Sequence, residues 1–106
     1  MIHKTAIIDP KSKISSNVVV GAYSIIGPNV EVGENSILAG QVGIAGSSII
    51  GNNVKIGGQA GISGHINVGN NVEIGGGSGV IKNIPDNTKV MGYPAKNIRE
   101  FLRENK

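Results

Sequence analysis

Apolar side chains recur every six residues along most of the chain. Isoleucine, valine or leucine occupies each sixth position from Ile2 to Val80, fourteen positions in unbroken succession. The position two residues earlier is often small or β-branched, as at Ala6, Val18 and Val54. This spacing fits neither the 3.6-residue period of a helix nor one long alternating strand, and it is typical of repeat architectures. The pattern predicts an all-β solenoid of very short strands.

Turn-forming residues lie between the apolar positions. Asparagine, which tolerates the left-handed backbone region of sharp corners, stands at Asn17, Asn29, Asn35, Asn53, Asn71 and Asn83. If three hexads make one triangular turn, residues eighteen apart stack and fourteen hexads form between four and five coils. Asn17, Asn35, Asn53 and Asn71 then share one column and predict a ladder of side-chain amides.

Two of the three columns carry charges at the outward strand position. The eighteen-residue spacing stacks Lys13 on Glu31 and Lys55 on Glu73. Opposite charges on neighbouring strands attract each other, so both stacks predict solvent-facing charge pairs.

The third of these columns is uncharged, with Ile7 and Ile25 followed by Gly43, Gly61 and Gly79. Bare backbone along a strand face allows close approach by another group, so this face predicts a groove or a subunit contact. The alternative is that glycine only relieves crowding at corners. The expected margins of the groove are Tyr23, Gln41 and Gln59 on one side and Gly46, Gly64 and His65 on the other.

The six-residue period stops after Val80. Pro85, Asp86 and Asn87 predict a turn, and Ile98, Phe101 and Leu102 fall on one face of a short C-terminal helix. Pro94 suits the first turn of that helix. Because solenoid ends leave open sheet edges, we expect the helix to cap the last coil or a neighbouring subunit. The expected division is a β-helix over 1–85 and a turn with a capping helix over 86–106.

Composition narrows the possible functions. The 106 residues include 17 glycines, three aromatic residues and no cysteine, which excludes thiol chemistry and a thiolate metal site. A net charge of +3 without aromatic stacking residues argues against nucleic-acid binding. The start of the chain enters the repeat directly and no apolar window is long enough to span a membrane, so a cytoplasmic protein is expected. Two histidines and scattered carboxylates lack metal-ligand spacing, so no metal site is predicted.

Three segments carry a family resemblance: residues 39–47, residues 56–65, and the motif Met-Gly-Tyr-Pro-Ala-Lys at 91–96. They resemble the hexapeptide-repeat acyltransferases, and within that group the C-terminal β-helix of UDP-3-O-acylglucosamine N-acyltransferase. The resemblance implies a left-handed parallel β-helix that forms homotrimers. It also implies transfer of a 3-hydroxyacyl chain from acyl carrier protein to the 2-amine of a nucleotide sugar, a step of lipid A biosynthesis.

Specific residues take roles from this resemblance. His65 matches the second active-site histidine of the family and is the expected catalytic residue. The backbone N–H groups of Gly46 and Gly64 are placed to stabilise an oxyanion. Pro28 stands where the family has its catalytic general base, and the nucleotide-recognition domain of the family has no counterpart in the sequence. These two departures predict weak activity or none.

Three further residues are predicted to contact the substrate or the acyl donor, and two alternative functions stay open. Gln59 is expected to contact substrate, and Lys96 and Arg99 to meet an acidic acyl carrier protein or the phosphates of its pantetheine arm. The resemblance implies no covalently bound cofactor. One alternative is a non-catalytic structural trimer, a minimised or degenerate β-helix. Another is a small sugar acyltransferase that uses acyl-CoA, because residues 92–96 also resemble the cofactor-end motif of hexapeptide acetyltransferases.

Overall fold

The computed structural model describes residues 1–105 and begins with a regular series of very short strands. Thirteen strands of two residues follow each other: β1 Ile7–Ile8, β2 Lys13–Ile14, β3 Val19–Val20, β4 Ile25–Ile26, β5 Glu31–Val32, β6 Ile37–Leu38, β7 Gly43–Ile44, β8 Ile49–Ile50, β9 Lys55–Ile56, β10 Gly61–Ile62, β11 Asn67–Val68, β12 Glu73–Ile74 and β13 Gly79–Val80. The chain then forms β14 Lys89–Met91, β15 Lys96–Asn97 and the helix α1 Ile98–Glu104.

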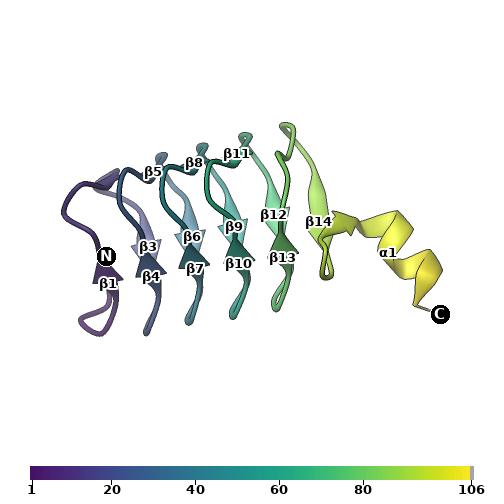
Figure 1. Ribbon diagram of the computed structural model, residues 1–106, viewed down its shortest axis with the longest axis horizontal. Helices are drawn as coiled ribbons and strands as arrows, with labels where there is room; N and C mark the ends of the chain where they lie inside the picture. Colours follow the sequence, from purple (N-terminus) through teal and green to yellow (C-terminus); the bar gives the residue numbers. More distant parts are fainter. Residues whose placement is uncertain (106) are drawn as a thin grey trace.

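Strands β1 to β13 pair in parallel with those eighteen residues away, as Ile7 does with Ile25. They build three sheets in the orders β1-β4-β7-β10-β13, β2-β5-β8-β11 and β3-β6-β9-β12-β14-β15. These sheets form the sides of a prism whose coils stack along the long axis of the molecule (Figure 1). The predicted solenoid with three columns is confirmed.

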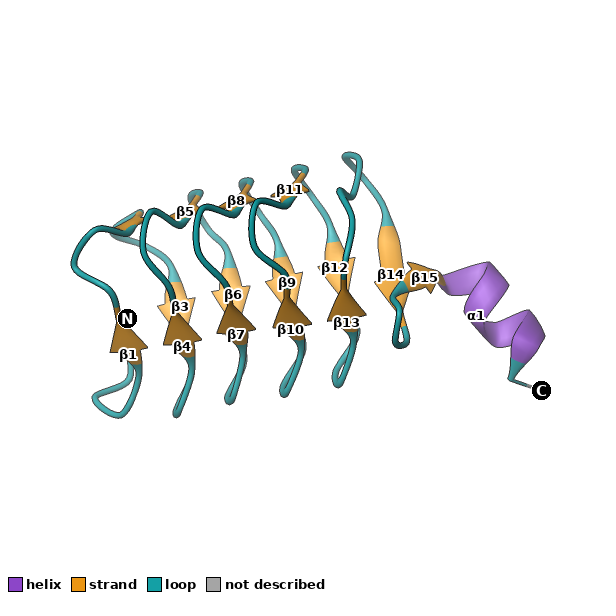
Figure 2. Cartoon of the chain, viewed as in Figure 1, coloured by secondary structure: helices purple, strands orange, loops and turns teal. Residues whose placement is uncertain are grey.

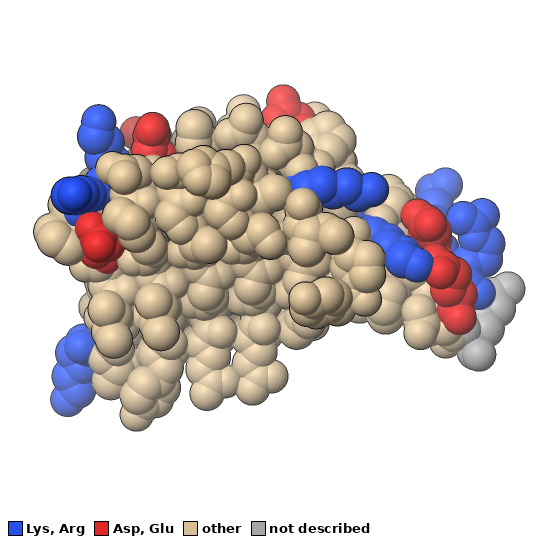
Figure 3. Space-filling view, in the orientation of Figure 1, with Lys and Arg blue, Asp and Glu red and all other residues tan. Residues whose placement is uncertain are grey.

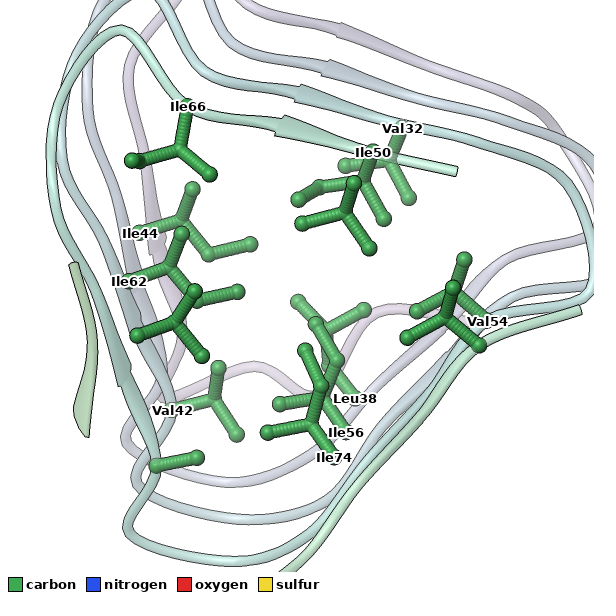
Figure 4. Close-up of a cluster of buried hydrophobic side chains, with 14 of the residues drawn as sticks. Val32, Leu38, Val42, Ile44, Ile50, Val54, Ile56, Ile62, Ile66 and Ile74 are labelled. Atoms are coloured by element: carbon green, nitrogen blue, oxygen red, sulfur yellow. The ribbon is translucent and has the colours of Figure 1, made fainter. Parts of the chain in front are cut away.

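The core is the apolar interior of this prism. Ile44 and Ile62 enter it from the first sheet, Ile50 from the second, and Leu38 and Ile56 from the third (Figure 4). Each is at most 3% exposed. Because consecutive strand residues point to opposite faces, the outward member of each pair is left available for other contacts.

Buried serine hydroxyls form hydrogen bonds between consecutive coils inside the prism. The hydroxyl of Ser36 donates to the carbonyl oxygen of Gly51 at 3.0 Å and accepts from the N–H of Val54 at 3.1 Å. Ser48 repeats the arrangement one coil further on, with Ser63 and Ile66 as its partners. These hydroxyls satisfy backbone groups that the corners leave without a ladder partner.

Replacing Ser36 by Ala is expected to lower the free energy of unfolding by about 1–3 kcal/mol, because the buried N–H of Val54 loses its acceptor. Urea unfolding followed by circular dichroism measures the change. Ser16→Ala, at an exposed corner, is the control. Equal midpoints for the two variants would show that the hydroxyl contributes no net stability.

The corners adopt left-handed backbone conformations at four of the six predicted asparagines but not at Asn17 or Asn83, and other residue types are used as well. Asn29, Asn35, Asn53 and Asn71 have positive φ angles. Tyr23, Gln41, Ser47, Gln59 and His65 also have them. The predicted amide ladder forms only in part. Asn17 donates to Asn35 at 2.7 Å, and Asn71 donates at 3.2 Å to Asn87, which the prediction did not include, whereas the side chain of Asn53 is joined to neither Asn35 nor Asn71.

The predicted charge stacks have the expected register, but among the described residues neither Lys13 with Glu31 nor Lys55 with Glu73 forms the predicted ion pair. Lys13 lies opposite Glu31, and Lys55 lies opposite Glu73. Glu73 nevertheless pairs with Lys89 on β14, at 3.2 Å. Glu73 has Lys89 as a second neighbour because the last coil is two residues shorter, which stacks Glu73 on a residue sixteen positions later.

The helix begins later than the sequence predicts. Pro94 follows a cis peptide bond from Tyr93 in a turn, and β15 then pairs antiparallel with β14. Asn97 caps α1 by accepting the N–H of Arg99 at 3.0 Å. Placing Pro94 in the first turn of the helix is therefore wrong. Figure 2 shows α1 in purple beyond the last coil, next to β14 and β15.

Candidate functional site

A shallow concavity lies on the outer face of the sheet that runs from β1 to β13. Gly43 and Gly61 form its floor, and a Cβ atom added to either would meet no atom within 4 Å. We call this region the glycine slot. It has a volume of about 630 Å³, with Ile25 near one end and Tyr93 at the other.

The slot is mainly apolar, and its polar groups lie along the sides. Gln59 lines it from one corner and is hydrogen-bonded through its side-chain amide to Gln41 at 2.8 Å. Ser63 lines it after β10. Figure 3 views this face and shows lysine, arginine, aspartate and glutamate gathered mainly toward its two ends. The slot therefore suits a flexible apolar chain more than a highly charged ligand.

Gly46, Gly64 and His65 meet at the next corner of the prism. The N–H of His65 donates to the carbonyl oxygen of Gly46 at 3.1 Å, and His65 is exposed with a φ angle of 59°. In the same column the N–H of Ser47 donates to the carbonyl oxygen of Pro28 at 2.9 Å. The corner therefore stacks Pro28, Gly46 and Gly64 on successive coils, beside the edge of the slot that Ser63 forms.

Lys96 and Arg99 lie apart from this corner, on β15 and α1 beyond the last coil. The ammonium group of Lys96 lies 2.5 Å and 2.8 Å from the two carboxylate oxygens of Glu104. This hydrogen-bonded ion pair raises the pKa of Lys96 above its ordinary value, and Glu100 adds to the effect. Lys96 is thus already engaged within the chain, whereas the Arg99 side chain is exposed.

The structure therefore gathers some predicted site residues and separates others. Gly46, Gly64 and His65 share a corner, Gln59 lines the slot, and Lys96 and Arg99 lie at the C-terminal end. Sequence reasoning did not assign Ser63 or Tyr93 to the site. The phase of the repeat places Ser63 directly after an inward residue, but no periodic signal marks Tyr93.

Among residues 1–105, no three histidine, aspartate or glutamate side chains gather so that they could hold a metal ion. Within the same residues, no helix has the length and apolar character needed to cross a membrane.

These features define a class of protein built on six-residue repeats. They are parallel β-helices in which small outward side chains leave a groove along one face. The chain belongs to the GMPPB C-terminal domain family, whose model matches residues 1–106. No curated protein matches the sequence.

Solved structures place the fold among acyltransferases. Serine acetyltransferase of Neisseria gonorrhoeae superposes with a TM-score of 0.85 at 29% identity, over 89% of this chain and 42% of that chain. Serine acetyltransferase of Brucella abortus in complex with coenzyme A gives 0.82 at 30% identity, over 86% and 40%. UDP-N-acetylglucosamine acyltransferase of Francisella novicida gives 0.81 at 25%, over 88% and 42%. The chain thus spans about two fifths of these proteins.

The fold predicted from the sequence, a left-handed parallel β-helix of hexapeptide repeats with a short C-terminal helix, is confirmed, with about five coils. The resemblance to hexapeptide-repeat acyltransferases is confirmed at the level of that fold group.

Proposed function

We propose that this chain is an acyltransferase domain that holds an acyl thioester in the glycine slot and presents its carbonyl carbon to the corner of His65. The observation that carries the proposal is the slot itself, an apolar trench with a bare glycine floor beside a corner that bears a histidine. A second copy of the protein would be needed to enclose the acyl group, because the slot is open toward solvent on this face. We also propose that the chain forms a homotrimer and lies in the cytoplasm.

The acceptor proposed is the 2-amine of a nucleotide sugar, UDP-3-O-acylglucosamine, and the donor is a 3-hydroxyacyl thioester. The amine nitrogen attacks the thioester carbonyl carbon, a C–N bond forms, and the C–S bond breaks. His65 takes the proton from the amine and returns it to the departing thiolate. The N–H groups of Gly46 and Gly64 are the candidates to stabilise the oxyanion formed on the way.

The pantetheine thiol of either acyl carrier protein or coenzyme A would carry the acyl group. The likeness to a serine acetyltransferase solved with coenzyme A supports acyl-CoA as a donor. Arg99, exposed on α1, is proposed to meet the phosphates of that donor, whereas Lys96 must first leave Glu104. An acyl-CoA-dependent transfer to a smaller sugar uses the same slot and corner.

Filling the slot is expected to prevent donor binding. Gly61→Phe places a ring on the floor where a Cβ atom meets no neighbour within 4 Å, so the fold should tolerate it. The affinity for octanoyl-CoA, measured by titration calorimetry, should fall about tenfold or more, because the ring takes the space of the chain.

Asn67→Phe is the matched control, since it adds the same ring at the outward position of β11 on a different sheet. The two variants should unfold at similar temperatures. Equal affinity of Gly61→Phe and Asn67→Phe for octanoyl-CoA would show that the slot does not hold the donor.

A second candidate function is a non-catalytic structural trimer. The observation that favours it is Pro28, which occupies the corner column of Gly46 and Gly64 and offers only its backbone carbonyl to the N–H of Ser47. A proline cannot accept a proton, so the column lacks a second base. Single-turnover transfer from octanoyl-CoA or a 3-hydroxyacyl carrier protein to UDP-3-O-acylglucosamine separates the candidates. A folded sample that binds donor without transfer would support the structural one.

A further inference from the structure

We propose that Ser63 accepts the acyl group when no amine is bound, so that the chain also hydrolyses acyl thioesters through an ester formed on this serine. The inference rests on the proposed function, because the donor must lie in the glycine slot and His65 must handle a proton. It adds a nucleophile and a second activity, thioester hydrolysis, to that site. It follows from the succession of Ser63, Gly64 and His65 between the slot and the corner.

Ser63 joins the slot to the corner of His65. It directly follows β10, lines the slot and is exposed, so its hydroxyl borders the space proposed for the thioester. Its N–H donates to the carbonyl oxygen of Val80 at 2.9 Å. Its carbonyl oxygen accepts from the hydroxyl of Ser48 at 2.6 Å. The fold therefore fixes the main chain of Ser63, and its hydroxyl moves only by rotation about the Cα–Cβ bond.

The first corner of the chain shows that a histidine and a hydroxyl at this interval can bond directly. Thr5 lies two residues after His3, and its hydroxyl oxygen is 2.9 Å from Nδ1 of the His3 ring. His3 and Ser63 each directly follow an isoleucine of the inward series. Thr5 and His65 each stand two residues later, at a corner. Ser63 and His65 thus hold the same two places of the hexad, with the residue types exchanged.

The hydroxyl of Ser63 and the ring of His65 are not hydrogen-bonded to each other in the structure, and His65 has a φ angle of 59° that Thr5 does not share. Both side chains are exposed, and neither bonds another group among residues 1–105. Rotation of either side chain therefore breaks no hydrogen bond. Catalytic hydrogen bonds often tighten only when substrate is bound, so we expect the contact to form with the donor in the slot.

Gly64 supplies a donor for the oxyanion. No carbonyl oxygen or side chain in the described part of the chain accepts its N–H. In hydrolases that use a serine nucleophile, the N–H of the residue after the serine is a common oxyanion donor, because the carbonyl oxygen of the adduct lies next to it. Nucleophile, oxyanion donor and base therefore follow one another along the chain.

The reaction has two steps. The Ser63 oxygen attacks the thioester carbonyl carbon, a C–O bond forms and the C–S bond breaks, and His65 moves the hydroxyl proton to the departing thiolate. Water then attacks the ester carbonyl carbon. His65 takes a proton from this water and gives it to the Ser63 oxygen as the C–O bond to the serine breaks. The products are a carboxylic acid and a free thiol, and Ser63 is restored.

The test is incubation of the full chain with octanoyl-CoA and no sugar, followed by mass spectrometry of the denatured protein. The parent chain should gain one octanoyl group in place of a hydrogen atom, and peptide mapping should locate it on Ser63. Because the chain has no cysteine, a thiol reagent reports the released coenzyme A without background from the protein. A burst of about one thiol per chain should precede slower steady release.

Ser63→Ala should gain no octanoyl group and lose the burst, and His65→Asn should slow the burst about 10²–10⁴-fold. Ser15→Ala is the matched control. Ser15 also directly follows an inward isoleucine, but it lies outside the slot and has asparagine two residues later. Ser15→Ala should behave like the parent chain.

An octanoyl group added to Ser63→Ala at the parental rate overturns the role of Ser63. A parent chain that transfers the acyl group to UDP-3-O-acylglucosamine, yet forms no adduct when the sugar is left out, overturns this inference and leaves the proposed function intact. A folded parent chain that neither forms the adduct nor transfers the acyl group overturns both.

Discussion

Replacing Gly57 by Ala is expected to destabilise the β-helix by about 3 kcal/mol or more, at the upper end of the usual cost of overpacking. A Cβ atom at Gly57 would lie 2.4 Å from the backbone nitrogen of Gly76 and 2.7 Å from its Cα atom. Backbone atoms cannot rotate away as a side chain does, so the two coils must separate. That separation weakens the bond from the N–H of Gly57 to the carbonyl oxygen of Ile74, now 2.7 Å long.

The matched control for this variant is Gly43→Ala. The added methyl group meets no atom within 4 Å, and the glycine has an ordinary strand conformation. Loss of backbone freedom in the unfolded chain should leave this variant as stable as the parent or about 0.4–1 kcal/mol more stable. Urea unfolding monitored by circular dichroism compares the two. Similar midpoints for Gly57→Ala and Gly43→Ala would mean that coil packing tolerates a methyl group at the crowded position.

Replacing His65 by Asn is expected to slow acyl transfer by about 10²–10⁴-fold, the usual contribution of a general base. Asparagine is the informative replacement, because His65 has a φ angle of 59° and asparagine tolerates that region, whereas alanine adds backbone strain. The variant should bind octanoyl-CoA with unchanged affinity, since His65 does not line the slot. Rapid-quench single-turnover measurements with saturating donor report the transfer step alone.

His3→Asn is the control for this experiment. His3 is the other histidine of the chain; it lies in the first coil and its ring is hydrogen-bonded to the hydroxyl of Thr5 at 2.9 Å. Transfer by His3→Asn should match the parent. If His65→Asn also transfers at the parental rate, the proton is handled elsewhere and the corner has no catalytic role. If the parent itself transfers nothing, the structural candidate is favoured.

Sequence reasoning placed individual residues well wherever the repeat continues. The inward series predicted the burial of Leu38, Ile44 and Ile56, and the columns predicted the register of Lys13 with Glu31. The ion pair of Glu73 was assigned to the wrong lysine. The prediction of columns depends on eighteen residues in every coil. The final coil has two residues fewer and still stacks on the coil before it, so Lys89 was not recognised as a neighbour of Glu73.

The same limit applies to the candidate site. The uncharged face and the position of Gln59 at its margin could be predicted from the phase of the repeat. Sequence did not separate the open glycines of the slot from Gly79, which occupies an equivalent position in the repeat. Only the return of the loop 92–95 distinguishes them.

The sequence by itself determined the solenoid, its three columns and its core, because a period of six residues repeats the same inward and outward choice at every coil. The tertiary structure alone decided where the period ends and what closes the slot. Tyr93 has no counterpart eighteen residues away, so its position depends on one contact with Gly79 and on hydrogen bonds that form only when the last coil is in place. A periodic pattern encodes contacts between equivalent positions, whereas a unique contact leaves no periodic trace.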